Sequence, residues 1–450
     1  MTPATPFSTS PRTEVRGPVW IAAIILFTTL LPPEVRVTLG GIELFSYRLA
    51  FLLLLPFIVR HAPANVRKPV PSDLMVLFSV LWMVAAMVAN QGFAAGIQRS
   101  LSVAMDLLLG YVVARASIAS INDLRRLLVI MAPMFLLAGL LVMIESVTHG
   151  LIIQPAVQKI FPNIEAMGIV VTSLANYQTR MGLFRGVGTF PHPILGGLYL
   201  ASVVPLYFTS HLRGWPRKLG LLAGGLAFFT VSSTAFMMLA LSLGLLFYDR
   251  LTRMVRGIRW QGLLLVVGLG LAGYQLFSTH GLIGLTVKLA MDGNTAYYRA
   301  LTWQFAGAAV AAHPIFGLGD GHFARPVWMV SDTIDNYWLL LAVRYGYAVP
   351  AAQLLATISV MFQLGQGSRL VDRTDSRFLR GLCMTISVVT LGGFFVALFS
   401  GVQIWFAVLL GCGANCALFA RGQDKLRQSR VIAEQRARNA RQHARPVAAR

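Results

Sequence analysis

The sequence predicts an all-α polytopic membrane protein with about twelve transmembrane helices, and three observations carry this prediction. The 450-residue chain has 56% hydrophobic and only 12% charged residues, and its mean hydropathy is +0.67. A soluble protein could not cover its surface with so few charges. Its apolar runs approach the roughly 20 residues that a helix needs to cross a bilayer. The runs are continuous, without the alternation of barrel strands.

The expected spans follow the apolar runs along the chain. We interpret the pair 219–234 and 235–249 as two short spans joined by a turn near Ser232, Ser233 and Thr234. The twelve spans lie near 18–32, 44–59, 72–90, 101–118, 127–146, 194–211, 219–234, 235–249, 260–278, 347–364, 381–400 and 402–420.

Tails flank the membrane domain, which covers residues 18–420. Residues 1–17 are polar and lack a small-residue cleavage site after a short apolar core, so we expect a cytoplasmic tail and an uncleaved first span. Residues 421–450 are rich in Arg, Gln and Ala, and we expect a basic cytoplasmic tail that is surface-lying or disordered.

The net charge of +21 is concentrated in alternate joints and in the C-terminal tail. Lys and Arg mark cytoplasmic loops, so about twelve spans place every basic joint and both termini in the cytoplasm. This placement favours anionic membrane lipids over nucleic acid as the partner of the charge. The basic joints hold Arg12/Arg16, Arg60/Arg67/Lys68, Arg115/Arg125/Arg126, Arg213/Arg217/Lys218, Arg250/Arg253/Arg256/Arg259 and Arg369/Arg373/Arg377/Arg380.

Two long segments, 147–193 and 279–346, then lie on the opposite, periplasmic side. Long connections in compact proteins are usually binding or catalytic loops. The second segment gathers arginines, histidines and acids between aromatic residues. We therefore expect these two segments to build the site of a membrane enzyme.

Arg180, Arg185 and Arg299 lie in these segments. A guanidinium group matches phosphate oxygens bidentately and stays charged at neutral pH. Arginines facing outward near the bilayer therefore suit a lipid-linked diphosphate. The alternative is that each caps a helix, snorkels to the membrane surface, or pairs with an acid such as Glu165 or Asp332.

Other polar residues of the two segments allow two interpretations each. Asp335 is either a general base or the N-cap of a helix that begins at Tyr337. His192 either forms a turn or contacts an acceptor hydroxyl, and His313 shapes a turn or takes a similar role.

The apolar runs also contain an aspartate and three cysteines. Asp106 lies squarely within a span and either pairs with a neighbouring helix or serves a mechanism. The three cysteines fall in apolar runs, where we expect them to pack between helices. The outer segments carry no DxD-like carboxylate cluster, so we expect neither a metal nor another cofactor.

Four stretches in order resemble the O-antigen ligase/polymerase superfamily, bacterial inner-membrane enzymes that join polyprenyl-diphosphate-linked glycans. The stretches are RGVGTFPHPILGGLYLASVVPL, FFTVSSTAFMMLALSLGLL, YYRALTWQFAGAAVAAHPIFGLGDGHF and DNYWLLLAVRYGYAVPA, within residues 180–350. The chain departs from the family pattern at three positions. Thr234 replaces an arginine, Asp335 stands where ligases commonly carry a histidine, and Arg344 replaces a glutamate.

This resemblance implies a GT-C-like helical fold and a metal-independent glycosyltransferase with its centre on the periplasmic face of the bacterial inner membrane. It would make Arg185, Arg299 and Asp335 catalytic, with both arginines on the donor diphosphate. Arg180, His192, His313 and Asn336 would bind substrate. The expected partners are a polyprenyl-diphosphate-linked glycan donor, a glycan or lipid acceptor, and a chain-length regulator or flippase as candidate proteins.

The leading hypothesis is a polymerase of exopolysaccharide or O-antigen repeat units. The second is an O-antigen ligase that moves the finished glycan to lipid A-core or another acceptor. The third, from another class, is a flippase or transporter of lipid-linked sugar. Transporters commonly show internal repeats and intramembrane carboxylates, and we see no such repeat here.

Overall fold

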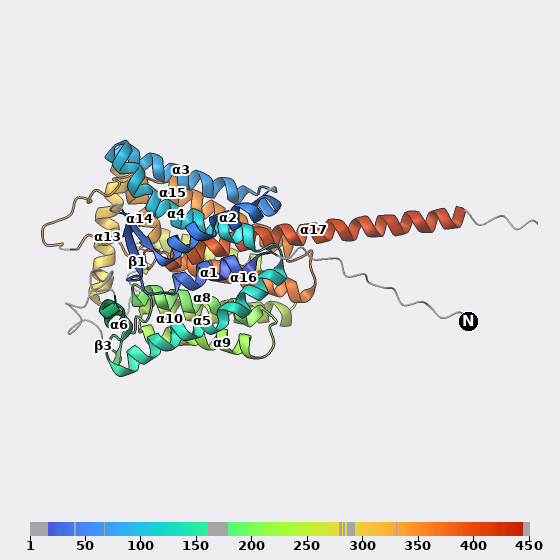
Figure 1. The fold of residues 1–450 in the computed structure, drawn as a ribbon, viewed down its shortest axis with the longest axis horizontal. Helices are drawn as coiled ribbons and strands as arrows, with labels where there is room; N and C mark the ends of the chain where they lie inside the picture. The colour runs from blue at the N-terminus through green and yellow to red at the C-terminus, as the bar shows by residue number, and fades with distance from the viewer. Residues whose placement is uncertain are drawn as a thin grey trace, which may run out of the picture.

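The computed structural model describes residues 17–39, 42–66, 68–160, 179–278, 281, 284–285, 293–329 and 331–443. Its helices form an elongated bundle, and the last helix projects far beyond one end (Figure 1). The elements before residue 161 are α1 (Val19–Thr29), β1 (Arg36–Leu39), β2 (Ile42–Phe45), α2 (Ser46–Val66), α3 (Pro71–Gln91), α4 (Phe93–Ser117), α5 (Ile121–Thr148) and α6 (Ile153–Ile160). The later elements are β3 (Thr179–Arg180), β4 (Leu183–Phe184), α8 (Pro193–Thr209), α9 (Trp215–Gly225), η1 (Leu226–Thr230), α10 (Ser233–Met254), α11 (Trp260–Phe277), α13 (Gly293–Ala312), α14 (Tyr337–Tyr345), α15 (Ala348–Gly367), α16 (Arg373–Gly392) and α17 (Gly401–His443).

Six helices of the described chain are long and apolar enough to cross a membrane, namely α3, α5, α10, α11, α15 and α17. α4 bends by 42° between Leu101 and Val103 and would be a seventh if both halves form one span. The apolar helices α1 and α8 have only 11 and 17 residues. The prediction of a largely helical protein with several membrane-length helices is confirmed, whereas the number twelve stays a prediction.

The apolar pair predicted as spans 219–234 and 235–249 has a different internal structure. α9 ends at Gly225, and a 3-10 helix continues it to Thr230. Val231 then adopts a left-handed φ of 44°, and α10 runs for 22 residues from Ser233. The helical structure is interrupted beside the expected turn. The result is one short helix, α9, and one helix of membrane-spanning length, α10, rather than two short spans.

The C-terminal tail departs from the expectation of a surface-lying or disordered segment. α17 passes through the expected boundary at residue 421 and continues as one helix of 43 residues to His443. Between Gly422 and His443 the sequence is rich in strong helix formers such as Ala, Arg, Gln and Glu and has no proline. Residues 444–450 lie outside the described part of the chain.

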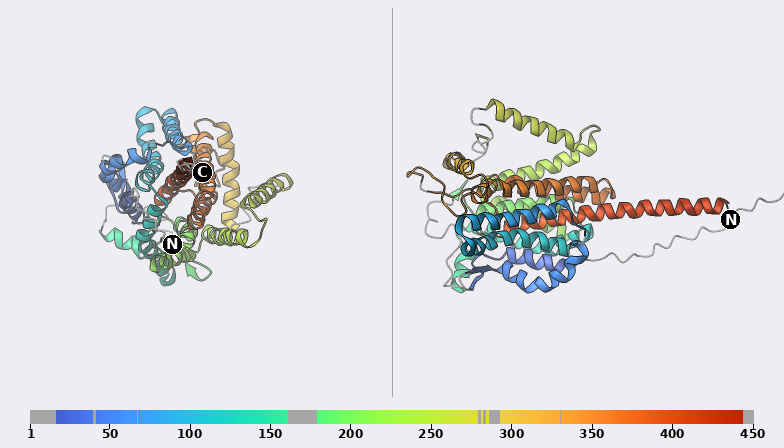
Figure 2. Two further views of the ribbon diagram at one scale, coloured as in Figure 1. Left: turned by 90° about the vertical axis from the view of Figure 1, so that its right-hand side faces the viewer. Right: turned by 90° about the horizontal axis from the view of Figure 1, so that it is seen from above.

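The second predicted outer segment, 279–346, contains a helix of its own. α13 is 20 residues long and lies crosswise over the end of the bundle opposite to the projecting part of α17 (Figures 1 and 2). The first segment, 147–193, contains α6 and the short hairpin β3–β4. Its residues 161–178, including Glu165, lie outside the described residues.

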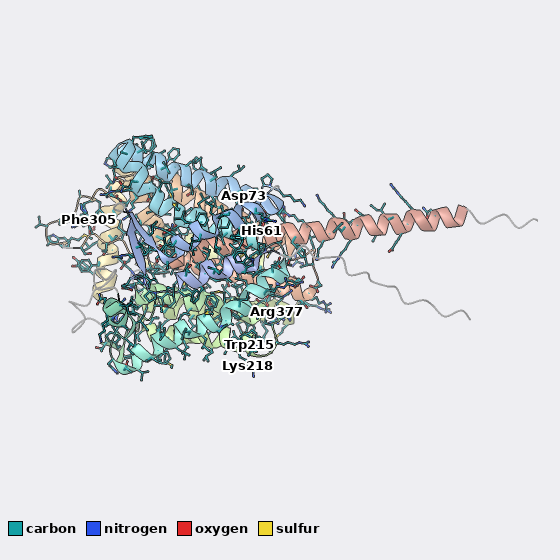
Figure 3. The ribbon with its side chains drawn as sticks, viewed as in Figure 1. His61, Asp73, Trp215, Lys218, Phe305 and Arg377 are labelled. Atoms are coloured by element: carbon teal, nitrogen blue, oxygen red, sulfur yellow. The ribbon has the colours of Figure 1, made fainter. Side chains whose placement is uncertain are left out.

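Basic joints lie at the end from which α17 projects. Lys218 and Arg377 are found there, whereas Phe305 of α13 lies at the opposite end (Figure 3). At the same basic end, the backbone nitrogen of Gly17 donates to Asp123 at the start of α5, at 3.1 Å. These positions agree with the predicted sorting of charge, and the assignment of that end to the cytoplasm stays a prediction.

The centre of the bundle is a packed aromatic core. The ring of Trp405 in α17 stacks on Tyr199 of α8, with a centroid separation of 5.3 Å. Its Nε1 donates to the hydroxyl of Ser202 at 2.9 Å, which satisfies the buried indole. Cys412 and Cys416 are buried in the same helix, and Cys383 is partly buried. Trp405 also packs against Phe135 of α5 at 5.9 Å, so this core joins α17 to α8 and α5.

Asp106 of α4 pairs with Arg48 of α2. Arg48 Nε and Nη2 donate to Oδ1 and Oδ2 of Asp106, each at 2.9 Å. Both residues are buried, with 6% and 4% exposure. The two-point contact gives the buried carboxylate the counter-charge that it requires. Of the two interpretations of Asp106, the contact supports pairing with a neighbouring helix.

Candidate active site

The loop before α8 carries Arg185 and is held by a buried carboxylate. Glu145, near the end of α5, has no exposed surface. Its Oε2 accepts hydrogen bonds from the backbone nitrogens of Val187 at 2.9 Å and Gly188 at 2.6 Å. Its Oε1 accepts from two further backbone amides at the start of α6. One side chain therefore sets the course of the chain on both sides of the hairpin β3–β4.

Glycines allow this loop to reach Glu145. A Cβ atom on Gly186 would lie 2.1 Å from the carbonyl oxygen of Val142 in α5. Gly188 has a φ of 60°, which side chains rarely permit. The backbone of this loop therefore packs directly on α5. Arg185 lies between the hairpin β3–β4 and Gly186, and only 5% of its surface is exposed.

The hairpin β3–β4 places Arg180 on the other side of a tight turn. Met181 and Gly182 both have positive φ, at 56° and 75°. Such values are expected for a two-residue hairpin turn that matches the right-handed twist of its strands. His149 Nε2 lies 3.0 Å from the carbonyl oxygen of Gly182. The turn is thus tied to the end of α5, and Arg180 stands at the same end of the bundle as Arg185.

Arg299 belongs to the crosswise helix α13 and points into the bundle. It is 8% exposed, its Nη2 donates to the carbonyl oxygen of Phe395 at 3.1 Å, and its guanidinium carbon lies 5.7 Å from the centre of the Phe395 ring. Its Nε and Nη1 are buried and have no hydrogen-bond partner among the described residues. Buried donors without partners are rare, and they often mark a site that a ligand completes.

Asp335 and Asn336 stand where the chain returns to the bundle. Asn336 is the N-cap of α14, because its Oδ1 accepts from the backbone nitrogen of Leu339 at 3.0 Å. Its Nδ2 donates to the carbonyl oxygen of Phe394 at 3.0 Å. The interpretation of Asp335 as the N-cap is therefore wrong, since the neighbouring residue fills that position. Asp335 itself is an exposed residue.

Electrostatic interactions connect the residues of this end, all of them outside the candidate membrane-spanning helices. Desolvation by the surrounding protein raises the pKa of Asp335, and the charges of Arg299 and Arg185 lower it. Residue 335 is nevertheless exposed to solvent, so a ligand can reach Asp335. Burial likewise lowers the pKa of Arg299, with Asp335 opposing and Arg180 adding to that shift.

His192 completes this group as the N-cap of α8. Its Nδ1 accepts a hydrogen bond from the backbone nitrogen of Ile194 at 3.1 Å. Burial lowers the pKa of His192 to about 3, and the charge of Arg185 acts in the same direction. The imidazole is therefore neutral near pH 7 with its proton on Nε2, which can donate to a ligand.

The structure thus brings together five of the seven predicted site residues, which we call the arginine cluster: Arg180, Arg185, His192, Arg299 and Asp335. Asn336 lies beside it, with both ends of its amide bonded to backbone. His313 does not join the group: it follows the last turn of α13, about 21 Å along the helix from Arg299 at 1.5 Å per residue, and its side chain is exposed. The substrate contacts predicted for His313 and Asn336 stay predictions.

The chain after His313 docks on the bundle through its glycines. Gly319 donates to the carbonyl oxygen of Arg344 at 3.0 Å, and Asp320 accepts from Arg99 at 2.6 Å and from Gln91 at 3.1 Å. Beyond it, His322 and Arg325 both contact Asp332 in an exposed loop. These contacts give Asp320 and Asp332 structural partners away from the arginine cluster.

Glu145 lies near the outer end of the predicted span 127–146. Its role in holding the Arg185 loop was missed, as were the backbone carbonyls of Phe394 and Phe395 that face Asn336 and Arg299. A charged residue at a span end, followed by a glycine-rich outer segment, was the available signal for Glu145. Backbone carbonyls carry no sequence signal.

Within the part of the chain that the structure describes, no group of three or more His, Cys, Asp or Glu side chains is placed to hold a metal ion. The fold defines the class of the protein as an α-helical membrane protein with several membrane-length helices. No protein-family model and no curated protein matches the chain.

Proposed function

We propose that this protein is a membrane glycosyltransferase that polymerises polyprenyl-diphosphate-linked oligosaccharide repeat units at the end of the bundle that carries α13. The observation that carries the proposal is Arg299, a buried arginine whose Nε and Nη1 atoms have no hydrogen-bond partner among the described residues. Leaving such donors without a partner costs about 1–3 kcal/mol each. A ligand rich in oxygen acceptors therefore fits this position.

A diphosphate is the acceptor-rich ligand that suits the cluster best. Arg180, Arg185 and Arg299 act on one another or on Asp335 through their charges. A guanidinium group can bind two phosphate oxygens at once through two parallel hydrogen bonds, and it remains protonated at neutral pH. The cluster also lies at an end of the bundle, where a lipid-linked substrate can keep its polyprenyl chain in the membrane.

Asp335 supplies the base of the proposed reaction. One of its carboxylate oxygens takes the proton of an acceptor hydroxyl as that oxygen bonds to the anomeric carbon of the donor sugar. The bond from this carbon to the diphosphate oxygen breaks, and its electron pair stays on the leaving diphosphate. Arg185 and Arg299 stabilise that charge, as preorganised donors do in other transfer enzymes. The anomeric configuration inverts.

The properties of the cluster fit these roles. A raised pKa makes Asp335 a stronger base than an ordinary aspartate. His192 is neutral and uses Nδ1 for the helix cap, so it supports the reaction as a hydrogen-bond donor rather than as the base. The proposal places the cluster on the periplasmic face of a bacterial inner membrane, with both termini in the cytoplasm.

The test uses purified protein in liposomes with a polyprenyl-diphosphate-linked repeat unit as the sole substrate, and product length is read on a gel. We expect ladders from the repeat unit alone. Product that forms only after addition of lipid A-core would replace the polymerase by a ligase. Movement of the lipid-linked sugar across the bilayer without a new glycosidic bond would replace the enzyme by a flippase.

A further inference from the structure

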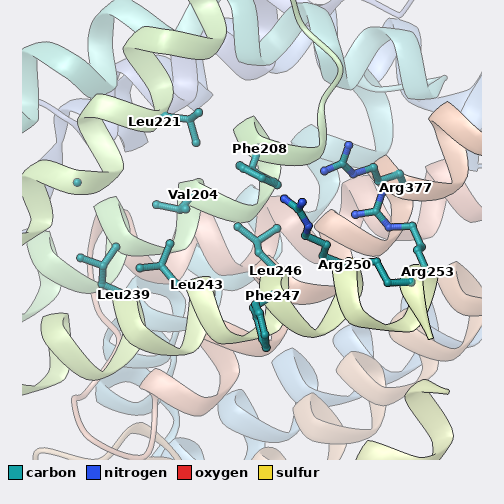
Figure 4. A pocket seen from close by; sticks show the side chains of 12 residues that line it. Val204, Phe208, Leu221, Leu239, Leu243, Leu246, Phe247, Arg250, Arg253 and Arg377 are labelled. Carbon is teal, nitrogen blue, oxygen red and sulfur yellow. The ribbon is translucent and has the colours of Figure 1, made fainter. Parts of the chain in front are cut away.

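A second feature lies at the opposite, basic end of the bundle. A cavity of about 890 Å³ opens between α8, α9 and α10 (Figure 4). Its volume falls within the roughly 300–1,000 Å³ of small-molecule sites. We call it the basic-end groove. Its lining is Val204, Phe208, Leu221, Gly225, Leu239, Leu243, Leu246, Phe247, Arg250, Arg253, Met254 and Arg377.

The walls of the groove are apolar and open to the side of the bundle. Val204 and Leu246 form a buried floor, with 5% and 6% exposure. Leu243 and Phe247 at the mouth are 55% and 68% exposed. In a membrane such a mouth faces lipid chains, so the groove is accessible from the bilayer.

Arginines gather at one end of the groove, near the end of α10 (Figure 4). Arg377 and Arg217 both lie 5.4 Å from the centre of the Phe208 ring. The charges that act on Arg377 come from three other arginines, Arg253, Arg217 and Arg380, and from one carboxylate, Asp249. Positive charge therefore exceeds negative charge around Arg377.

The carboxylate of Asp249 is already shared between two arginines. Asp249 is buried and contacts Arg253 at 3.3 Å and Arg380 at 3.1 Å. The Nε atoms of Arg377 and Arg217 are buried and have no hydrogen-bond partner among the described residues. An anion at this rim would neutralise excess charge and accept hydrogen bonds from the arginines.

We infer that the basic-end groove binds one anionic phospholipid, with its phosphate among Arg250, Arg253 and Arg377 and an acyl chain along the apolar walls. The depth fits this ligand. α10 has 22 residues, or about 33 Å at 1.5 Å per residue, and so matches the roughly 30 Å hydrocarbon core. Arg250 and Arg253 in its last turns thus reach the headgroup level. A soluble anion would leave the apolar walls unused.

The test compares lipid retention by native mass spectrometry. Protein is reconstituted in equal amounts of phosphatidylglycerol and phosphatidylcholine with identical acyl chains, extracted in mild detergent, and its bound lipids are counted. We expect wild type to retain one phosphatidylglycerol in preference to phosphatidylcholine. Arg250→Gln/Arg377→Gln should retain it about tenfold less, because charge-assisted hydrogen bonds to the phosphate are lost.

Two further variants complete the design. Arg213→Gln/Lys218→Gln removes the same charge from the same end, outside the groove lining, and should behave as wild type. Leu243→Trp keeps every arginine but narrows the groove at an exposed position, and it should also lose the lipid. Thermal unfolding and gel filtration of each variant confirm that it is folded.

Three outcomes would overturn the inference. The first is equal retention of the two lipids by wild type. The second is equal loss in the Arg213/Lys218 control, which would assign the effect to general surface charge. The third is full retention by Leu243→Trp, which would show that the apolar groove does not hold the acyl chain.

Discussion

A hydrogen bond of 2.6 Å joins Oε2 of Glu145 to the backbone nitrogen of Gly188, across 43 residues of sequence. It is one of four that this buried carboxylate accepts from backbone amides. Hydrogen bonds to a charged acceptor are stronger than neutral ones. Glu145 therefore acts as a positioning residue, which fixes the loop that carries Arg185.

Glu145→Gln should destabilise the protein and disturb the loop. An amide NH₂ replaces one oxygen and faces two N–H donors, so about 3 kcal/mol of stability is lost on the scale of two charge-assisted hydrogen bonds. A lower midpoint of thermal unfolding in detergent would show this. Glu434→Gln, on the exposed part of α17, makes the same chemical change and should have no effect. An equal midpoint for both variants would contradict the role.

Arg299→Gln should lower the rate of polymer formation by about 10²–10³-fold, the range for loss of one preorganised donor at developing charge. Arg299→Lys should recover little, because an ammonium group cannot form the two-point contact. The matched control is Arg325→Gln, which removes an arginine from the same outer segment; Arg325 contacts Asp332 and the carbonyl oxygen of Met329. The liposome assay with repeat unit alone measures all three. Normal chain length and yield in Arg299→Gln would remove this residue from the site.

Asp335 should give the reaction an acidic limb in its pH profile. The base works only when deprotonated, so the rate falls as pH falls through its pKa. That pKa lies above the ordinary aspartate value of 3.8, so the fall should begin at a higher pH than for an unperturbed aspartate. Initial rates measured from pH 4 upward in liposomes of constant composition test this.

The variant Asp335→Asn should abolish the limb and lower the rate by about 10²–10⁴-fold, as for loss of a general base. Asp332→Asn serves as its control, because Asp332 lies in the exposed loop with His322. A variant that keeps the wild-type rate and profile would leave the base to be sought elsewhere.

The buried pair Arg48–Asp106 should behave as a structural pair. Asp106→Asn leaves a buried guanidinium without its counter-charge and should cost about 3–5 kcal/mol of stability. The double variant Arg48→Met/Asp106→Leu removes both charges and should be more stable than either single variant. A double-mutant cycle of unfolding midpoints measures the coupling. Loss of activity with unchanged stability in Asp106→Asn would instead assign the aspartate to the mechanism.

Much of the fold could be predicted from local patterns. Continuous apolar runs require helices, because backbone groups in lipid must be satisfied within the segment. The helices α3, α5 and α15 therefore fall close to the predicted spans, and the break before α10 lies beside Ser232 and Ser233. Among the described residues six helices are long and apolar enough to cross a membrane, or seven if the two halves of α4 form one span, and the number twelve stays a prediction.

Local patterns could also select arginines and Asp335 as site candidates, since their chemistry suits a diphosphate. They could not decide between Asp335 and Asn336 as the helix cap, because both residue types cap helices. The hydrogen bond from the backbone nitrogen of Leu339 to Asn336 identifies Asn336 as the cap. The amide of Asn336 also donates to the carbonyl oxygen of Phe394, which lies 58 residues away in the sequence.

The class of the protein, the positions of its main helices and the sorting of its basic joints follow from local composition, and they could therefore be predicted from the sequence. Which helix ends meet depends on tertiary packing. Arg299 reaches Phe395 across 96 residues, and α13 lies over the bundle end rather than forming a loop. Such contacts depend on close packing between distant segments, as where Gly186 meets the backbone of Val142. No local pattern encodes which distant backbone a glycine will allow to approach.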